Sequence, residues 1–424
     1  MLPFYTLLTG YGAGRLNALL QRRLVRGKED PARLGERRGE ASRPRPEGRL
    51  IWLHAASVGE AQSALILIGA ILQRYPDFSI LVTTGTVTSA QLMAKKLPDR
   101  AVHHFMPLDH PDWVARFLDH WRPDFVLWME SEFWPNALLA LQKRSIPAAL
   151  VNARLSDRSY KKWRWLRADF ARLLSTFDIV FAQTDTDALR FQHFGAKAVI
   201  VSDNLKYSAA PLGFDEAVLQ DLKTAVQGRP VIVYASTHAG EEAMIGRIHT
   251  RLQDKFPNVL SIIIPRHPDR GAAIAAQLTA ASLSCALRTQ RPLPDSETHI
   301  YIADTLGELG LFYRLSTIVY IGRSLSDDGG GGHNPLEAAQ LDCAILHGPH
   351  VQNLQEIYDA LAAEDACLQA DSEEGLGYHL DRLLTEPERV QNYAARALAF
   401  SNAKSGVVDR VMAGLEPYLQ KAGS

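Results

Sequence analysis

The chain contains 424 residues with a mass of 47.0 kDa, a length at which two domains are expected rather than one core. Hydrophobic residues make up 46%, charged residues make up 22%, and the net charge is −1, so the chain as a whole has no charge signature for nucleic-acid binding. The three cysteines form no CxxC pattern, which argues against a disulfide framework or a zinc knuckle and favours a reducing, cytoplasmic setting.

Residues 1–48 form an N-terminal segment that is apolar at first and basic afterwards. No stretch reaches the ~18 apolar residues of a membrane-spanning helix, and glycines interrupt residues 1–14. Between Arg15 and Arg49, eleven Lys or Arg residues stand against five Asp or Glu residues. This order predicts peripheral attachment to the cytoplasmic face of an anionic membrane, with a plain surface helix as the alternative.

Short apolar strands alternate with amphipathic helices in two successive series. The first series is expected to have strands at 50–54, 79–83, 125–129, 148–151 and 179–182, with helices such as 61–74 and 135–143. A linker with a short helix is expected at 209–228. The second series then has strands at 231–235, 260–264, 299–302, 318–322 and 344–347, followed by helices at 386–419. The alternation predicts two Rossmann-like α/β domains, at 49–208 and 229–424, in the GT-B architecture with an active site in the cleft between them.

Two acidic motifs follow strands of the first series. Glu60 ends HAASVGE and is expected in the first turn of a helix, where a carboxylate can act as a general base towards an acceptor hydroxyl. Glu130 and Glu132 flank a serine directly after strand 125–129. The alternatives are charge complementarity at a helix N-terminus for Glu60 and N-capping for the Glu130 to Glu132 motif.

The second series carries groups suited to a phosphate. Ser236 and Thr237 follow strand 231–235, and Arg266 follows strand 260–264. Lys206 lies where the two domains are expected to join and could reach the same charge. For each of these residues the alternative is a helix cap or a surface cation.

The run GGGGHNPLE at 329–337 joins the apolar stretch 318–321 to the helix-like stretch 337–340. A strand, a glycine turn and a helix start direct backbone N–H groups at an anion. Glycines alone merely turn a chain, but the adjoining His333, Asn334 and Glu337 favour a ligand site. A further segment, from Arg154 to Arg167, has six Lys or Arg residues interleaved with Tyr and Trp, which supplies cations for phosphates and aromatic side chains for a membrane interface; a solvated basic helix is the alternative.

Together these segments resemble the 3-deoxy-D-manno-octulosonic acid (Kdo) transferase family of Gram-negative bacteria. The resemblance runs from about Lys28 to the end of the chain. It is carried, in the family's order, by HAASVGE, ESEFWPN, VNARLSDRS, NLKY, STHAGEE, PRHPDR, DTLGELGLFYRLS and GGHNPLE.

The resemblance implies an inverting GT-B enzyme that needs neither a metal nor a cofactor. Its donor would be CMP-Kdo and its acceptor the lipid A precursor (lipid IVA) of lipopolysaccharide core biosynthesis. Glu60 would be the general base, and Glu130 or Glu132 a further catalytic carboxylate. Substrate-binding residues are implied at Ser57, Gly59, Arg154, Ser156, Lys206, Ser236, Thr237, Arg266, Ser324, Gly331, Gly332, His333, Asn334 and Glu337.

Two other functions compete with this interpretation. One is another GT-B nucleotide-sugar enzyme, an epimerase or a hexosyltransferase, and the other is a non-catalytic binding protein that kept the fold. HAASVGE together with the basic and aromatic segment argues for an anionic lipid acceptor, and the presence of all three carboxylates argues against a binding protein. His103, His104 and His110 have no third ligand at a suitable spacing, so no metal site is expected.

Overall fold

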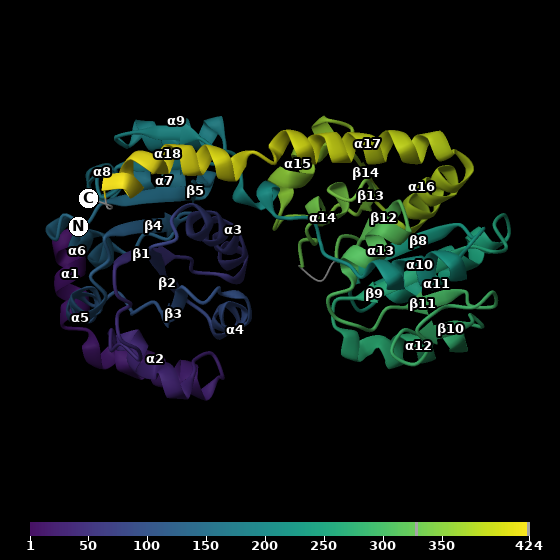
Figure 1. Ribbon diagram of the computed structural model, residues 1–424, viewed down its shortest axis with the longest axis horizontal. Coiled ribbons are helices and arrows are strands. Elements are labelled where there is room, and N and C mark those ends of the chain that lie inside the picture. Colours follow the sequence, from purple (N-terminus) through teal and green to yellow (C-terminus); the bar gives the residue numbers. More distant parts are fainter. Residues whose placement is uncertain (327–329, 422–424) are drawn as a thin grey trace. The chain divides into compact units, whose positions relative to one another are not determined.

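A computed structural model describes residues 1–326 and 330–421 (Figure 1). The chain divides into two compact units. Unit 1 comprises Met1–Ala209 together with the C-terminal segment from Ser405, and unit 2 comprises Ala210–Lys404. Each unit is built on a seven-stranded sheet in which every strand pairing is parallel, so the expected α/β class is confirmed.

The sheet of unit 1 has the strand order β3-β2-β1-β4-β5-β6-β7. Its strands are β1 (Arg49–His54), β2 (Phe78–Thr84), β3 (Ala101–Phe105), β4 (Phe125–Met129), β5 (Ala148–Ala153), β6 (Ile179–Ala182) and β7 (Val199–Val201). β1 is near the middle, with Leu53 paired to Val82 on one side and to Leu127 on the other. The carboxyl ends of β1, β4 and β5 therefore meet at one edge of the sheet, where both acidic motifs begin.

Helices cover both faces of this sheet (Figure 1). They are α1 (Leu2–Gly10), α2 (Ala13–Val25), the 3-10 helix η1 (Pro31–Arg38), α3 (Val58–Arg74), α4 (Val87–Lys96), α5 (Pro111–Trp121), α6 (Pro135–Lys143), α7 (Asp157–Trp165), α8 (Arg167–Leu174), α9 (Asp185–His193), the 3-10 helix η2 (Leu205–Ser208) and α18 (Val407–Lys421). Side-chain oxygens of Ser57, Thr86 and Thr184 accept backbone N–H groups at the starts of α3, α4 and α9, which is why these helices begin where they do.

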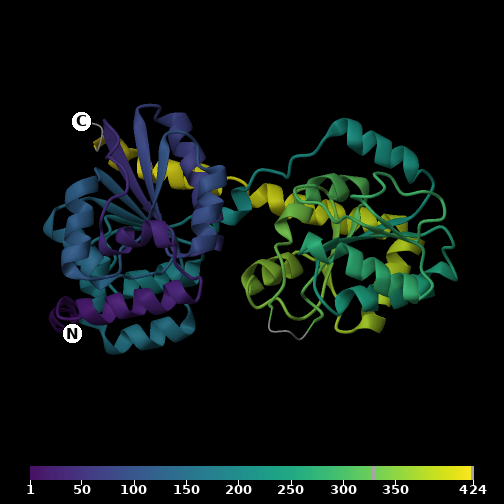
Figure 2. The same ribbon diagram turned by 90° about the horizontal axis from the view of Figure 1, so that it is seen from below.

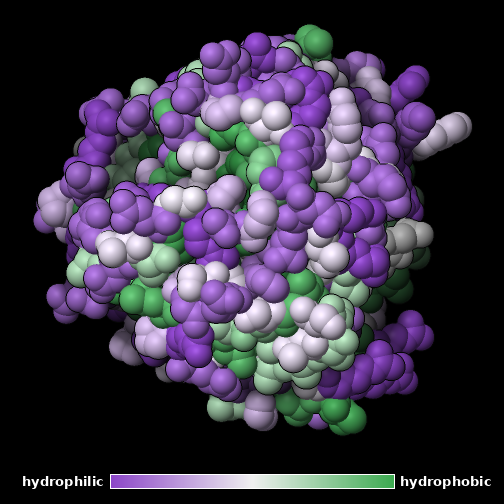
Figure 3. All heavy atoms as spheres, turned by 90° about the vertical axis from the view of Figure 1, so that its right-hand side faces the viewer, coloured by the Kyte–Doolittle hydropathy of each residue, from purple (hydrophilic) through white to green (hydrophobic). Residues whose placement is uncertain are grey.

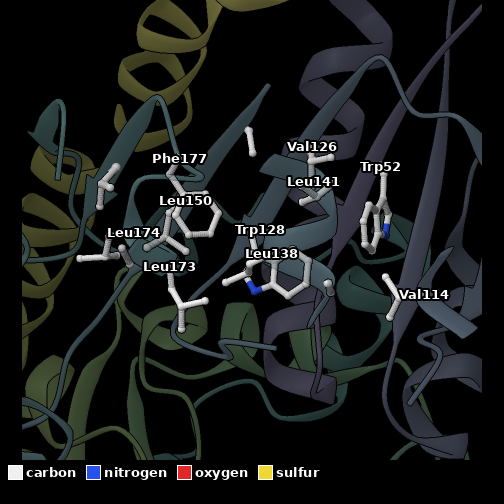
Figure 4. Packing of buried hydrophobic residues seen from close by; sticks show 14 of the residues in the cluster. Trp52, Val114, Val126, Trp128, Leu138, Leu141, Leu150, Leu173, Leu174 and Phe177 are labelled. Atoms are coloured by element: carbon white, nitrogen blue, oxygen red, sulfur yellow. The ribbon is translucent and has the colours of Figure 1, made fainter. Parts of the chain in front are cut away.

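The core of unit 1 packs aromatic side chains of β1 and β4 against α5 and α6. Trp52 and Trp128 are fully buried and meet edge to face, with ring centroids 5.5 Å apart. The indole N–H of Trp52 donates to the hydroxyl of Thr83 at 2.8 Å, so its burial leaves no donor unpaired. Figure 4 shows part of this cluster, which includes Leu138 of α6 and Leu150 of β5. This packing fixes the point at which the chain leaves β4.

Unit 2 repeats the architecture with the strand order β10-β11-β9-β8-β12-β13-β14. Its strands are β8 (Val231–Thr237), β9 (Leu260–Pro265), β10 (Cys285–Leu287), β11 (Ile300–Ile302), β12 (Ile318–Ile321), β13 (Ala344–His347) and β14 (Cys367–Gln369). Val233 of the central β8 pairs with Ile262 of β9 and with Val319 of β12. The segments after β8, β9 and β12 thus leave the same edge of this sheet.

The helices of unit 2 again lie on both faces (Figure 2). They are α10 (Glu216–Ala225), α11 (Glu241–Gln253), the 3-10 helix η3 (Pro268–Arg270), α12 (Gly271–Ala280), α13 (Leu309–Leu315), α14 (Leu336–Ala339), α15 (Gln355–Ala363), α16 (Glu373–Thr385) and α17 (Pro387–Lys404). On the face shown in Figure 3, hydrophobic residues occupy small areas among hydrophilic ones.

The structure differs from the expected domain limits at two places. Residues 209–228 are expected to be a linker, but all from Ala210 onwards belong to unit 2, where α10 packs on α13 and Arg314 donates to the carbonyl of Leu212 at 2.7 Å. The last helix is expected in the second domain, but α18 packs on α3 of unit 1 (Figure 1). Its apolar stripe, including Val411 and Leu415, is buried there. The sequence shows that this stripe needs a partner but not which unit supplies it.

The N-terminal segment is a folded part of unit 1. α1 packs on α5 and α6, and η1 is held by ion pairs from Arg37 to Glu29 (2.8 Å) and from Arg33 to Glu36 (2.8 Å). Part of the basic cluster that the sequence assigns to a membrane surface is therefore engaged inside unit 1. Within the described residues, none of the helices combines the length and the apolar character that crossing a membrane requires.

Candidate functional site

Glu60 stands in the first turn of α3, as the sequence predicts. Its Oε2 accepts the N–H of Ala56 at 2.8 Å, and its own N–H donates to the hydroxyl of Ser57 at 3.3 Å. Ser57 is thus the N-cap of α3, and the bond from Ala56 holds the Glu60 carboxylate at the exit of β1. Glu60 is 7% exposed, and within the described residues its other oxygen, Oε1, makes no hydrogen bond. A structural contact and an available oxygen therefore coexist on one side chain.

Glu130 and Glu132 are brought next to Glu60. Glu130 is half-buried and has a left-handed backbone with φ of 54°, an unfavourable conformation for a residue with a side chain. Burial first, and the charge of Glu60 second, raise the pKa of Glu130 to about 7. Desolvation and the charge of Glu60 also raise the pKa of Glu132, whose Oε2 accepts the indole N–H of Trp134 at 3.1 Å. The three carboxylates thus form one interacting group.

Cations and an amide complete this group. The charges of Lys206 and Arg154 lower the pKa of Glu130 against the two effects that raise it. The ammonium group of Lys206 also lies beside Gly59 at the start of α3. Asn152, buried and with φ of 55°, donates to Glu130 at 3.4 Å and accepts the N–H of Leu205 at 3.0 Å. Lys206, expected to reach a donor phosphate, is in this structure a neighbour of Glu130.

The raised pKa of Glu130 has a testable consequence for stability. The folded chain holds the proton of Glu130 up to about pH 7, whereas the unfolded chain releases it near the ordinary value of 4.5. Between these values the folded state binds more protons, so the stability contributed by the neutral carboxyl is lost as the pH rises. We expect Glu130→Gln to remove this loss, so that the variant gains stability relative to wild type by about 2 kcal/mol between pH 5 and 7. Urea unfolding of both proteins at several pH values in this range measures the difference in stability. If the free energies of unfolding of the two proteins change with pH in parallel, the prediction is contradicted.

In unit 2, the buried carboxylate of Glu241 organises two strand exits. Its oxygens accept the N–H of His238 at 2.9 Å, the N–H of Arg323 at 2.8 Å and the hydroxyl of Tyr320 at 2.8 Å. Ser236, at the irregular end of β8, and Arg323, after β12, both have left-handed backbones with φ of 57°. Glu241 therefore fastens the loop after β12 to the loop after β8, which is the region expected to contact a donor phosphate.

Two predicted binding residues use their hydroxyls inside unit 2. Thr237 is fully buried and donates to Glu242 at 3.0 Å, and Glu242 also pairs with Arg270 at 2.8 Å. Ser324 is fully buried, and its hydroxyl donates to the carbonyl of Ile321 at 2.6 Å. These two hydroxyls shape the loops rather than face solvent.

Other predicted residues remain accessible at this edge. Ser236 is half-buried, and Arg266 is exposed directly after β9. Within the described ranges, the guanidinium of Arg266 makes no hydrogen bond or ion pair, and its backbone N–H donates to the carbonyl of Thr237 at 3.0 Å. Arg266 is therefore a charge held at the sheet edge without a protein counter-ion in this part of the chain.

The glycine motif is a tight, mostly buried turn; Gly329 lies outside the described residues. Gly331 and Gly332 have φ of 74° and 75°, and a Cβ on Gly331 would stand 2.8 Å from the side chain of Asn353. Both glycines are therefore needed for the turn itself. The half-buried His333, Asn334 and Glu337 follow, and Asn334 accepts the N–H of Leu336, the first residue of α14, at 3.2 Å. α14 has only four residues, so its dipole contribution is small.

Two histidines meet at this turn. The Nε2 atoms of His238 and His333 are 3.0 Å apart, and the rings are stacked with centroids 5.2 Å apart. The ring of His267 lies 5.9 Å from that of His238. His238 and Glu241 were not among the predicted site residues, although both belong to the motif STHAGEE. In unit 1, Asn152 was missed in the same way within VNARLSDRS.

The basic and aromatic segment forms α7, on which no side chain is buried. Ser156 caps this helix by accepting the N–H of Ser159 at 3.3 Å, and Arg154 precedes it with an exposed side chain. Trp163 stacks on Phe170, with centroids 4.4 Å apart, whereas Trp165 is 90% exposed. Only part of the aromatic content is thus available at the surface.

Across residues 1–326 and 330–421, no group of three or more His, Cys, Asp or Glu side chains is arranged to hold a metal ion.

Two Rossmann-like units, each with polar loops at the carboxyl edge of a parallel sheet, define the GT-B class shared by glycosyltransferases and related nucleotide-sugar enzymes. A solved structure of a putative UDP-N-acetylglucosamine 2-epimerase from Listeria monocytogenes superimposes with a TM-score of 0.57 over 88% of this chain and 98% of its own. A UDP-GlcNAc 2-epimerase from Neisseria meningitidis has a TM-score of 0.55 over 86% and 100%. They are 14% and 17% identical in sequence, so this likeness establishes the fold alone.

Similarity in sequence identifies the family more specifically than similarity in fold. Residues 32–209 match the family described as 3-deoxy-D-manno-octulosonic-acid transferase (kdotransferase). A 3-deoxy-D-manno-octulosonic acid transferase of Rickettsia felis is 36% identical over 372 residues, which is 87% of this chain and 79% of the relative. The corresponding protein of Haemophilus influenzae is 32% identical over 399 residues, 92% of each chain. The chain belongs to the Kdo transferase family.

Proposed function

We propose that this enzyme transfers Kdo from CMP-Kdo to the lipid A precursor lipid IVA in lipopolysaccharide core biosynthesis, with inversion at the anomeric carbon. The observation that supports this most directly is the group of three interacting carboxylates at the exits of β1 and β4, found in a chain of the Kdo transferase family. A glycosyl transfer to a hydroxyl needs a base at the acceptor oxygen, and these carboxylates supply it.

Glu60 is the proposed general base. Its Oε2 is held by the N–H of Ala56, and Oε1 takes the proton of the acceptor hydroxyl. The hydroxyl oxygen forms the bond to the anomeric carbon of Kdo, and CMP leaves with the electrons of the broken glycosyl bond. The charge balance is complete when the protonated Glu60 releases its proton to solvent.

Glu130 is proposed to limit the negative charge beside Glu60. Burial and the charge of Glu60 raise the pKa of Glu130 to about 7, so a protonated Glu130 adds no repulsion to a second carboxylate next to it. Lys206 and Arg154 balance the remaining negative charge. Ser57 and Gly59 shape the turn, and Ser156 begins the helix that follows Arg154.

Unit 2 is proposed to bind the donor. The accessible Ser236, Arg266, His333, Asn334 and Glu337 are proposed to contact CMP, and Arg266 to stabilise the departing phosphate because it has no protein counter-ion among the described residues. Thr237, Ser324, Gly331 and Gly332 set the loop conformation, since their hydroxyls or backbones are used inside unit 2.

The proposal is tested by mass spectrometry of products made from purified enzyme, CMP-Kdo and lipid IVA. A gain of one or more Kdo units supports it. Absence of such a product from folded, donor-binding enzyme would refute it. UDP-N-acetylglucosamine in place of CMP-Kdo serves as the control donor, and product from that donor would point to a different nucleotide-sugar enzyme.

Donor cleavage is proposed to proceed without a metal or a cofactor, because the cationic side chains above can stabilise the departing CMP. We therefore expect EDTA to leave the initial rate of Kdo transfer unchanged. A large loss of rate that added Mg²⁺ restores would contradict this part of the mechanism.

Attachment to the cytoplasmic face of the inner membrane is proposed to occur through α1 and α2. Phe4, Leu7 and Leu8 of α1 are 66%, 57% and 54% exposed, an unusual density of large apolar side chains on one short helix. The exposed Arg15 and Arg22 of α2 add positive charge next to them. Co-sedimentation of the full chain with phosphatidylglycerol vesicles tests this attachment, and recovery in the supernatant at low salt would exclude it.

A further inference from the structure

The helix α1 has a polar face that is turned into unit 1. Tyr5 donates its hydroxyl to Asp109 at 3.0 Å, and Thr6 donates to the side-chain oxygen of Asn136 at 2.7 Å. The side-chain N–H of Asn136 in turn donates to Thr9 at 2.8 Å. Three side chains of one short helix therefore make hydrogen bonds with only two residues of the domain body.

Those two residues meet at the start of α6. Asp109, in the loop after β3, accepts the backbone N–H of Asn136 at 3.0 Å and of Ala137 at 2.9 Å. Its carbonyl accepts the side-chain N–H of Asn136 at 2.6 Å. Asp109 and Asn136 are 5% and 4% exposed, and within the described residues no Lys or Arg pairs with Asp109. A buried carboxylate thus caps α6 from outside its own sequence neighbourhood.

The same helix start is joined directly to the carboxylate loop. α6 begins at Pro135, and Glu132 precedes it by three residues. Two hydrogen bonds restrict the segment between them. The indole N–H of Trp128 donates to the carbonyl of Glu132, and the indole N–H of Trp134 donates to the carboxylate of Glu132 at 3.1 Å. A shift of the first turn of α6 must therefore move the loop that carries Glu130 and Glu132.

We infer that Asp109 and Asn136 are positioning residues, which use the polar face of α1 to hold the start of α6 and thereby place the carboxylates of Glu130 and Glu132. The inference rests on the proposed function for the role of those carboxylates. The placement itself rests only on the contacts of α1, Asp109 and Asn136. An ordinary stabilising cap is the alternative, and it predicts lower stability without a change at the carboxylates.

Asp109→Asn in the full chain tests the inference, because the amide keeps the size of the side chain but turns a donor towards the backbone N–H groups. We expect kcat for Kdo transfer to fall about 10- to 100-fold with KM for CMP-Kdo unchanged, since a small misplacement of reacting groups is costly. We also expect the indole N–H signal of Trp134, in NMR spectra of tryptophan-labelled chain, to move and to lose its wild-type pH response.

Tyr5→Phe is a second variant with a smaller expected effect, because it removes one hydroxyl and leaves the cap of α6 in place. It should shift kcat and the Trp134 signal in the same direction by a smaller amount. Asp124→Asn is the matched control. Asp124 accepts the N–H of Leu50 at 2.7 Å at the amino end of β4, away from the carboxylate loop. This variant should leave kcat and the Trp134 signal as in wild type.

The outcomes separate the inference from the proposed function. If Asp109→Asn and Tyr5→Phe both fold and keep the wild-type kcat and Trp134 signal, the positioning role is refuted. If Asp109→Asn does not fold, Tyr5→Phe decides by the same two measurements. If wild type transfers no Kdo while the Trp134 signal still responds to both variants, the proposed function fails and the positioning stands.

Discussion

Replacement of Glu60 by Gln is expected to lower kcat for Kdo transfer by about 10²- to 10⁴-fold, the range by which general bases contribute. The amide oxygen can still accept the N–H of Ala56, so the turn before α3 is preserved while the basic oxygen is lost. Affinity for CMP-Kdo should be unchanged, because the proposed donor contacts are on unit 2. Single-turnover transfer and calorimetric binding of CMP-Kdo measure the two quantities separately.

Glu60→Gln is also expected to change the pKa values of the neighbouring carboxyl groups. The charge of Glu60 contributes to raising the pKa of both Glu130 and Glu132, so both should titrate at lower pH in Glu60→Gln. The Trp134 indole signal reports this for Glu132, to which it donates. Thr86→Ala is a control that removes a helix cap from α4 without touching a carboxylate. It should lower stability slightly and leave kcat unchanged, whereas a near wild-type kcat in Glu60→Gln would refute the assignment of the base.

The central strands of both sheets could be predicted from the sequence because their residues are continuously apolar. Strands 125–129, 179–182 and 344–347 have the same limits in the sequence and in the structure. The strands that were missed are β3, β7, β10 and β14, the four edge strands of the two sheets. β7, β10 and β14 have three residues each, and β3 contains two histidines, so their composition carries little signal.

The carboxylates could be predicted because residues that follow parallel strands gather at one edge of the sheet, which brings Glu60 close to Glu130. The residues that hold these carboxylates in place could not be predicted from the sequence. Asn152 and Asp109 act on backbone N–H groups that are distant in sequence, Leu205 for the first and Asn136 for the second. Such pairings depend on how the loops pack, and the sequence does not indicate which backbone N–H a polar residue after a strand will bind. The burial of Thr237 could not be predicted for the same reason, because its partner Glu242 is set by the fold.

Glu241→Ala is expected to lower the free energy of unfolding of unit 2 by about 3 to 5 kcal/mol, because each buried donor left unpaired costs about 1 to 3 kcal/mol. The N–H groups of His238 and Arg323 and the hydroxyl of Tyr320 all lose their acceptor. The substitution removes the carboxylate that joins the Arg323 N–H, after β12, to the His238 N–H at the β8 exit. Affinity for CMP-Kdo should therefore fall at least tenfold even at temperatures where unit 2 remains folded.

Ser316→Ala separates loss of stability from loss of the loop. Ser316 is also buried, donates to the carbonyl of Val231 at 2.6 Å and accepts the N–H of Ile318 at 3.2 Å, but it lies at the amino ends of β8 and β12. Its removal should destabilise unit 2 in calorimetry while CMP-Kdo still binds as in wild type. If both variants weaken donor binding equally, Glu241 acts through overall stability alone. If Glu241→Ala binds CMP-Kdo as wild type does, the loop it fastens is not part of the donor site.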